Sequence, residues 1–332
     1  MMKKVKRSDG RKKFSVKLLI GFVLFELVFT TITTPMVLLY GPFEKSKKMF
    51  LGTAIGSMHY QWLATTFMSQ EKIDEILGTN IQETEGVIEE QDTSLVDIPV
   101  VKDDTIQQAT VTGEHYYGHV LIINEPTRVK VGVSSKIGTE GETTSQIAIN
   151  NNAVAAINGG AFASDPDQAE WTQNGGIPTG ILISEGKLIH NDKGEDEKTD
   201  IAGITANGLL VAGKYSYSEL KEMNVVDALS FGPVLIQNGK KVAIPETGTS
   251  PRTLIGQRAN GSIVLVVLDS KDENRVSATL SEAQEVMAQL DCITATNLDG
   301  GKSTTMYYNG EVINNPSFAL GERTILSGFI VK

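Results

Sequence analysis

Asn260-Gly-Ser-Ile-Val-Leu-Val-Val-Leu268 is the stretch that best defines the fold of this 332-residue chain. It joins a turn dipeptide to a run of Val, Ile and Leu, and such runs bounded by Gly or Asn are typical of strands. Similar runs follow residue 106, at His119–Ile123, Arg128–Val133, Ala153–Ile157 and Gly180–Ile183. Asn-Gly also stands between apolar runs at 207–208, 238–239 and 309–310. Because Asn-Gly is the strongest short hairpin signal, the pattern predicts a mostly antiparallel sheet.

Helices are fewer and are marked by their caps. Thr279-Leu-Ser-Glu282 is a capping box, because the Thr hydroxyl and the Glu carboxylate can each satisfy a free backbone N–H. Residues 143–151 and 69–77 favour two more short helices, the second capped by Ser69. The predicted fold class is therefore α+β: a mostly antiparallel sheet with a few packed helices, preceded by an N-terminal transmembrane helix.

The first forty residues indicate the compartment. Residues 1–13 are rich in Lys and Arg, and Leu18–Tyr40 is long enough to cross a bilayer, which takes about 20 apolar residues. Basic flanks stay inside, so we predict a single-pass cell-membrane protein with an extracellular C-terminal domain. A cleaved signal peptide is the alternative, although its apolar region is usually ~7–15 residues and a small-x-small cleavage site should follow.

These features divide the chain into four parts. Residues 1–13 form a cytoplasmic basic tail and 14–40 a transmembrane signal anchor. Residues 41–105 form a juxtamembrane helical segment and a linker, because the stretch 79–104 is acidic and poor in aromatic residues. Residues 106–332, where the strand-like runs lie, are expected to form the main domain, the candidate catalytic domain.

Composition excludes several classes of protein. The formal net charge of -10 argues against a nucleic-acid partner, because phosphate backbones demand a basic face. A single cysteine, Cys292, allows no intrachain disulfide. The four histidines show no HExxH spacing, so nothing predicts a zinc site, and no cofactor is implied.

Two Gly-rich turns combine polar groups with close backbone approach. Asn158-Gly159-Gly160 follows an apolar run, and Asp299-Gly300-Gly301 with Ser303 follows a predicted helix and a short strand. Glycines let backbone N–H groups approach a ligand, and the second segment is also suited to an anion nest. Each turn alone is equally consistent with plain turn structure.

Further blocks with the same character accompany these turns. They are Pro178-Thr-Gly180, Phe231-Gly-Pro-Val234, Pro251-Arg-Thr253 and Gly321-Glu-Arg323. Together with Ile157–Phe162 and Asn297–Gly301, they resemble the phosphodiester glycosidase family, in the family's order across roughly residues 115–332. That family includes the enzyme that removes N-acetylglucosamine from a phosphodiester to uncover mannose 6-phosphate. One departure is at Asp269-Ser-Lys, where the family often has Asp-Gly-Arg.

The resemblance implies hydrolysis of a sugar-1-phosphodiester at its glycosidic C–O bond. Glycosidases usually place two carboxyl groups around the reacting carbon. The implied catalytic residues are Asp299 as nucleophile or base, Arg252 as the cation on the phosphate and Glu322 as acid or base. The implied substrate-binding residues are Asn158, Gly159, Gly160, Gly300, Gly301, Ser303, Arg323 and Asp269, with Arg323 as a second candidate cation.

Alternatives remain open on the sequence alone. The implied partner is a phosphodiester-linked glycan or cell-wall polymer. A non-catalytic glycan-binding or assembly module is the rival hypothesis, and a hydrolase that cuts the P–O bond is a third. Asp269 and Asp299 are able to share a divalent metal, although no residue requires one.

Overall fold

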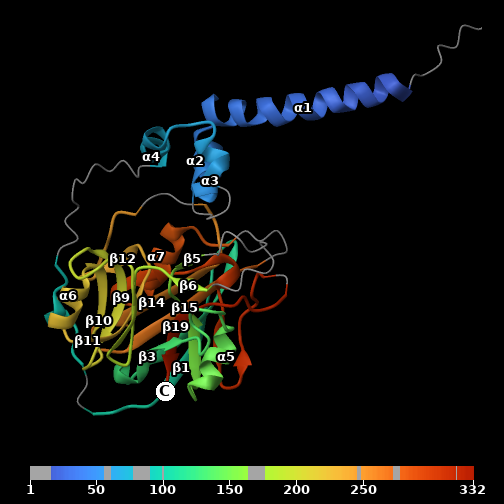
Figure 1. The fold of residues 1–332 in the computed structure, drawn as a ribbon. Helices are drawn as coiled ribbons and strands as arrows, with labels where there is room; N and C mark the ends of the chain where they lie inside the picture. Colours follow the sequence, from blue (N-terminus) through green and yellow to red (C-terminus); the bar gives the residue numbers. More distant parts are fainter. Residues whose placement is uncertain are drawn as a thin grey trace, which may run out of the picture.

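The computed structural model describes residues 16–55, 61–77, 90–98, 101–163, 176–244, 248–271, 277–318 and 320–332. The predicted basic tail, residues 1–13, lies outside the described residues. In the described part, strands dominate after residue 105 and helices before it, as the colours of Figure 1 show.

The described residues of the domain form three antiparallel sheets and a two-stranded ribbon. The seven-stranded sheet has the order β1 (Ile106–Thr112), β2 (Tyr116–Ile123), β15 (Ile263–Ser270), β14 (Arg252–Arg258), β16 (Cys292–Leu298), β12 (Val234–Gln237) and β13 (Lys240–Lys241). The second sheet has the order β10 (Leu210–Tyr215), β9 (Thr199–Thr205), β11 (Val225–Ser230), β7 (Ile181–Ser184) and β8 (Lys187–Asn191). The third has the order β18 (Glu311–Val312), β17 (Met306–Tyr308), β4 (Ala155–Asn158), β19 (Ser327–Val331) and β3 (Val129–Val133). The ribbon pairs β5 (Phe162–Ala163) with β6 (Ile177–Pro178).

The hairpin predictions are confirmed. All four Asn-Gly dipeptides connect paired strands: β9 with β10, β12 with β13, β14 with β15, and β17 with β18. At Asn238-Gly239 and Asn309-Gly310 both residues have positive φ. Two successive positive φ values define the turn that matches strand twist, which is why Asn-Gly is used there.

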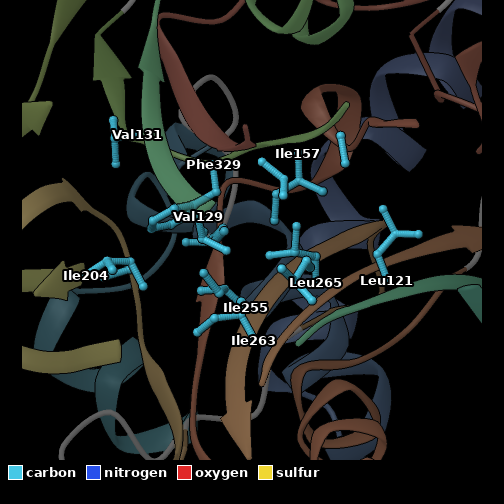
Figure 2. Packing of buried hydrophobic residues seen from close by; sticks show 14 of the residues in the cluster. Leu121, Val129, Val131, Ile157, Ile204, Ile255, Ile263, Leu265 and Phe329 are labelled. Carbon is cyan, nitrogen blue, oxygen red and sulfur yellow. The ribbon is translucent and has the colours of Figure 1, made fainter. Parts of the chain in front are cut away.

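The two faces of the seven-stranded sheet are both buried. Leu121, Ile255 and Leu265 point to one face, where Ile157 and Phe329 of the third sheet meet them (Figure 2). Their chain neighbours point to the other face and pack under helix α7 (Leu280–Gln289). Because side chains alternate along a strand, each residue at the end of this sheet faces either the core between the sheets or helix α7.

Short helices pack against the sheets: α7 on the seven-stranded sheet, α5 (Thr144–Asn150) on the third sheet and α6 (Tyr217–Glu222) on the second. The capping box at Thr279 and Glu282 forms as predicted at the start of α7. A second capping box, Thr143 with Gln146, begins α5, and α6 has a third. The described residues also form short 3-10 helices at Thr93–Leu95, Pro126–Arg128 and Gly301–Ser303.

The N-terminal helices have a small core of their own. They are α1 (Val16–Tyr40), α2 (Glu44–Ile55), α3 (Gln61–Thr65) and α4 (Gln70–Leu77), the last beginning after Ser69 as predicted. Leu39, Leu51, Ala64 and Ile73 are buried together. Most large apolar side chains of α1 are exposed, and Leu19–Tyr40 is long and apolar enough to cross a membrane, with a mean hydropathy of 1.9.

Part of the expected linker lies against the domain. Gln91 is buried, and its side chain donates a hydrogen bond of 2.6 Å to the Leu210 carbonyl. The Asp97 amide donates to the Ala259 carbonyl. Residues 90–98 therefore pack on the sheets, although the sequence-based boundary of the domain is at residue 106.

Candidate active site

The two Gly-rich turns meet where β16 ends. The Asp299 amide donates to the Gly159 carbonyl at 3.0 Å, and Asn158 Nδ2 donates to the Asp299 carbonyl at 2.6 Å. Asn158 ends β4 of the third sheet, whereas Asp299 follows β16 of the seven-stranded sheet. These two hydrogen bonds therefore hold Asp299 at the junction of two sheets.

Asn158 is fully buried, and its side chain has several protein partners. Its Oδ1 accepts hydrogen bonds from the Thr253 hydroxyl at 2.8 Å and from the Thr305 amide at 3.1 Å. Thr253 and Thr305 are also fully buried. Because buried polar groups need hydrogen bonds, this network fixes the Asp299 turn. The geometry supports positioning of Asp299, rather than direct substrate contact, as the role of Asn158.

Gly159 and Gly160 allow the close approach of the neighbouring strands. Both amides donate to the Ser327 carbonyl, at 3.1 and 3.4 Å. A Cβ on Gly159 would lie 2.7 Å from Leu229, and one on Gly160 would lie 2.3 Å from Ser327 Oγ. The resemblance implies that these amides orient the substrate. In the structure they instead donate hydrogen bonds to Ser327 and pack the turn against the neighbouring strand.

The second glycine pair brings the turn against Pro251. A Cβ on Gly300 would lie 2.6 Å from the Pro251 carbonyl oxygen, which accepts a hydrogen bond of 2.8 Å from the Gly301 amide. Gly301 has φ +60°, a conformation that side chains rarely adopt. The Asp-Gly-Gly sequence therefore serves a tight turn between neighbouring strands.

The Asp299 carboxyl group is the most perturbed acid of this junction. Burial raises the pKa of Asp299 to about 6, while the Ser303 hydroxyl, the charge of Arg323 and the Gly300 amide each lower it. Its Oδ2 is enclosed and has no hydrogen-bond partner among the described residues. A carboxylate with one uncommitted oxygen and a pKa near neutrality is suited to act as nucleophile or base.

Arg323 is the cation beside this carboxyl group. Its guanidinium lies over the Phe162 ring at 5.0 Å and reaches Ser303 Oγ at 3.5 Å. Ser303 in turn donates to Asp299, and the charge of Arg323 lowers the pKa of Asp299. The second candidate cation of the sequence analysis therefore lies next to the candidate nucleophile.

Arg252 is directed to the other face of the sheet. On β14, Leu254 packs under α7 and Ile255 packs in the core between the sheets, so Arg252 and Thr253 alternate in the same way. The Arg252 guanidinium donates to the carbonyls of Gly248 and Ala278, at 2.8 and 3.2 Å. Burial lowers its pKa to about 10. The structure thus brings Thr253, not the arginine, to the Asn158 network.

Glu322 is engaged at the start of α5. Its carboxylate accepts from the Ser145 amide at 2.9 Å and from the Ser145 hydroxyl. These groups belong to the first turn of the helix, where backbone N–H groups lack partners and negative charge is favourable. Among the described residues, the contacts of Glu322 therefore support helix capping and do not pair it with Arg323.

Asp269 lies on the same end of the seven-stranded sheet, at the end of β15. Its two oxygens accept hydrogen bonds from the Asn314 side chain and the Asn315 amide, both at 2.9 Å. Burial raises the pKa of Asp269, and these hydrogen bonds and His119 lower it. Among the residues that the structure describes, no three His, Cys, Asp or Glu side chains gather at a possible metal site.

Sequence reasoning missed two contributors to this junction. Thr253 belongs to the block Pro251-Arg-Thr253, but no role for it was predicted from the sequence. The available signal was that neighbouring residues on a strand point to opposite faces, so Thr253 and Arg252 cannot both face the site. Phe162, at the end of another block, provides the ring beneath Arg323. Thr253 bonds Asn158 of another sheet and Phe162 contacts Arg323 of a distant loop, and no local pattern reveals such contacts.

The fold and this junction define a class of protein. A sequence model of the phosphodiester glycosidase family matches residues 151–332, and the chain belongs to that family. The catalytic domain of zebrafish N-acetylglucosamine-1-phosphodiester alpha-N-acetylglucosaminidase, auto-inhibited by its pro-peptide, has a similar fold. The TM-score is 0.56 at 21% identity, over 71% of this chain and 86% of that one.

Relatives of known name are mammalian and bacterial. The mouse N-acetylglucosamine-1-phosphodiester alpha-N-acetylglucosaminidase is 29% identical over 231 residues, which are 62% of this chain and 42% of that protein. The human enzyme is 31% identical over 182 residues, or 49% of this chain and 33% of that protein. An uncharacterized prophage-derived protein of Bacillus subtilis, YomE, is 26% identical over 60% of this chain. The chain thus spans less than half the length of these relatives.

Proposed function

We propose that this chain hydrolyses a sugar-1-phosphodiester, breaking the bond between the anomeric carbon and the phosphate oxygen. The observation that carries the proposal is the Asp299 carboxyl group, which is buried, has one unpartnered oxygen and lies beside Arg323. Family membership and the names of the relatives support the choice of substrate class.

The chemistry follows from the charges at this junction. Asp299, when ionised, either attacks the anomeric carbon, forming a glycosyl ester that water then hydrolyses, or takes a proton from the attacking water. The C–O bond breaks, and its electron pair leaves with the phosphate monoester. Arg323 neutralises the charge that develops on that phosphate, a type of stabilisation often worth 10²–10³ in rate. Such a leaving group makes a strong general acid less necessary, which fits the capping role of Glu322.

The location is part of the proposal. Helix α1 would act as an uncleaved signal anchor, with the domain on the outer side of the cell membrane. Its exposed apolar side chains and its length support a membrane span. Phosphodiester-linked glycans or cell-wall polymers outside the cell would then be the natural substrates.

Turnover of a diester in ¹⁸O-labelled water tests the reaction. The full chain in detergent is incubated with N-acetylglucosamine 1-phosphate methyl ester. Label in the released sugar is expected, because the C–O bond breaks, whereas label in the phosphate would show P–O cleavage. Binding of the diester without any turnover would favour the rival glycan-binding module.

Asp299→Asn is the decisive variant. Turnover should fall at least 10³-fold, because an amide can neither attack nor accept the proton. The variant should remain folded. Since burial raises the pKa of Asp299 to about 6, ionisation weakens the native state as pH rises from the unfolded pKa through 6. At pH 7.5 the neutral Asn should therefore leave the Tm unchanged or higher. Normal turnover in this variant would overturn the assignment of Asp299.

A further inference from the structure

A polar pocket, of about 480 Å³, opens beside Asp269. Its walls come from the start of β2, the end of β15 and the segment after β18. The pocket is lined by Tyr117, His119, Asp269, Ser270, Lys271 and Asn315, among others. We call it the Asp269 pocket.

Strand register places this pocket on the same sheet end as Asp299. Asp269 pairs with Tyr117, and Leu268 pairs with Arg252 on the next strand. Arg252 precedes Thr253, which pairs with Leu298, the residue before Asp299. Since β15, β14 and β16 are neighbours, two strand spacings, roughly 10 Å, separate the two aspartate positions. A phosphodiester that carries a sugar on its second oxygen can extend over such a span.

One segment braces both places. Asn314 Nδ2 donates to Asp269 Oδ1 at 2.9 Å and to the Thr304 carbonyl at 3.1 Å. Ser317 Oγ donates to the Gly301 carbonyl at 3.2 Å. Because Gly301 belongs to the Asp299 turn, the pocket and the turn are held in a fixed relation.

Two buried polar atoms beside the pocket have no partner. His119 Nδ1 and Ser270 Oγ are enclosed and form no hydrogen bond within the described part of the chain. An unsatisfied buried group costs on the order of 1–3 kcal/mol, so its presence at a pocket is typical of a ligand site. Burial lowers the pKa of His119, which keeps the imidazole neutral and able to both donate and accept.

The remaining wall chemistry favours a hydroxyl-rich ligand over an anion. The Asp269 carboxyl group accepts hydrogen bonds and repels negative charge, and Lys271 already donates to the Gly113 carbonyl at 2.7 Å. Tyr117 meets His119 edge-on at 5.2 Å and is 40% exposed, so part of its ring is available for apolar contact. An aromatic surface among mixed donors and acceptors is suited to a sugar ring, whose hydroxyl groups do both.

We propose that the Asp269 pocket binds the sugar or polyol esterified to the second oxygen of the phosphate, while Asp299 faces the anomeric carbon of the sugar that is cleaved and Arg323 binds the phosphate. The inference rests on the proposed function and adds to it a specificity for the leaving group. His119, Asp269 and Tyr117 would bind that group, and none of them would take part in the bond-breaking step.

Two diesters with one common sugar test this subsite. N-acetylglucosamine 1-phosphate is joined either to methanol or to the 6-hydroxyl of methyl glucoside, and the full chain in detergent is assayed with both. The sugar diester should have a KM at least tenfold lower than the methyl diester. His119→Ala and Tyr117→Ala should each remove most of that difference and leave kcat/KM for the methyl diester within about twofold.

The matched control is His115→Ala. His115 lies just before β2, its side chain is 47% exposed, and it does not line the pocket. This variant should keep the wild-type preference. Equal kcat/KM for both diesters in the wild type, or a preference that survives in His119→Ala, would overturn the proposal.

A failure of the proposed function has a different signature. If neither diester is turned over, saturation-transfer NMR with methyl glucoside decides on the pocket alone. Ligand signals that are present in the wild type and in His115→Ala but absent in His119→Ala would support the pocket. No signal in the wild type would overturn it.

Discussion

Arg252 and Arg323 are two buried or half-buried cations near the same turn, yet they belong to different environments. Arg323 lies over Phe162 and reaches Ser303, which hydrogen-bonds Asp299. Arg252 lies on the opposite face of the seven-stranded sheet and donates hydrogen bonds to the carbonyls of Gly248 and Ala278. An arginine bound to carbonyls positions loops, whereas one beside a carboxyl group and a hydroxyl can handle the charge of a substrate.

The alternation of side chains along β14 explains this difference. Thr253 occupies the face toward β4, so its chain neighbour Arg252 must occupy the face toward α7. The sequence pattern ranked Arg252 above Arg323 as the phosphate cation because Arg252 belongs to the block Pro251-Arg-Thr253. In the structure, Thr253 of that block reaches the Asn158 network, whereas Arg252 supports the loops on the other face. Matched substitutions of the two arginines separate these roles.

Arg323→Gln and Arg252→Gln form the sharpest pair. At pH 8, Arg323→Gln should lower kcat/KM for the methyl diester about 10²–10³-fold, because one preorganised charge at the transition state is lost. Arg252→Gln should change kcat/KM less than about threefold and instead lower the Tm, since hydrogen bonds to buried carbonyls are lost.

A neutral substrate provides the control for this pair. The 4-nitrophenyl glycoside of N-acetylglucosamine has no phosphate, so Arg323→Gln should affect it much less than the diester. The reverse ranking, with Arg252→Gln the more damaging for diesters alone, would return the phosphate to Arg252.

The pH dependence of the wild type sharpens the role of Asp299. Burial raises its pKa to about 6, and a nucleophile or base works in its ionised form. We expect kcat/KM to be constant above pH 7 and to fall about tenfold per unit below 6, so that roughly a tenth remains at pH 5. Arg323→Gln should shift this limb to higher pH, because the charge of Arg323 lowers the pKa of Asp299. Activity that rises on acidification would instead make Asp299 a general acid.

Local features of this chain were predictable, and their tertiary roles were less so. Asn-Gly turns and capping boxes act within a few residues, so the hairpins and the start of α7 could be predicted. The Asp299 turn could be identified from the sequence because its backbone conformation and close packing require glycine at positions 300 and 301. The function of Asn158 depends on partners in Thr253 and Thr305, far away in the chain, and no spacing rule reveals them.

Glu322 is a second residue whose partner in the fold is far away in the chain, and its substitution should have the smallest effect. Next to Arg323 in the chain, it suggests an acid or base, but its carboxylate accepts hydrogen bonds from the first turn of α5. Glu322→Gln should therefore lower the free energy of unfolding by about 0.5–1 kcal/mol, the usual value of a charge at a helix start, and change kcat less than twofold. Chemical denaturation and steady-state kinetics measure both. Glu322→Asp should recover part of the stability, because it restores the negative charge. A 10²-fold fall in kcat at unchanged stability would restore the catalytic role, since capping alone cannot produce it.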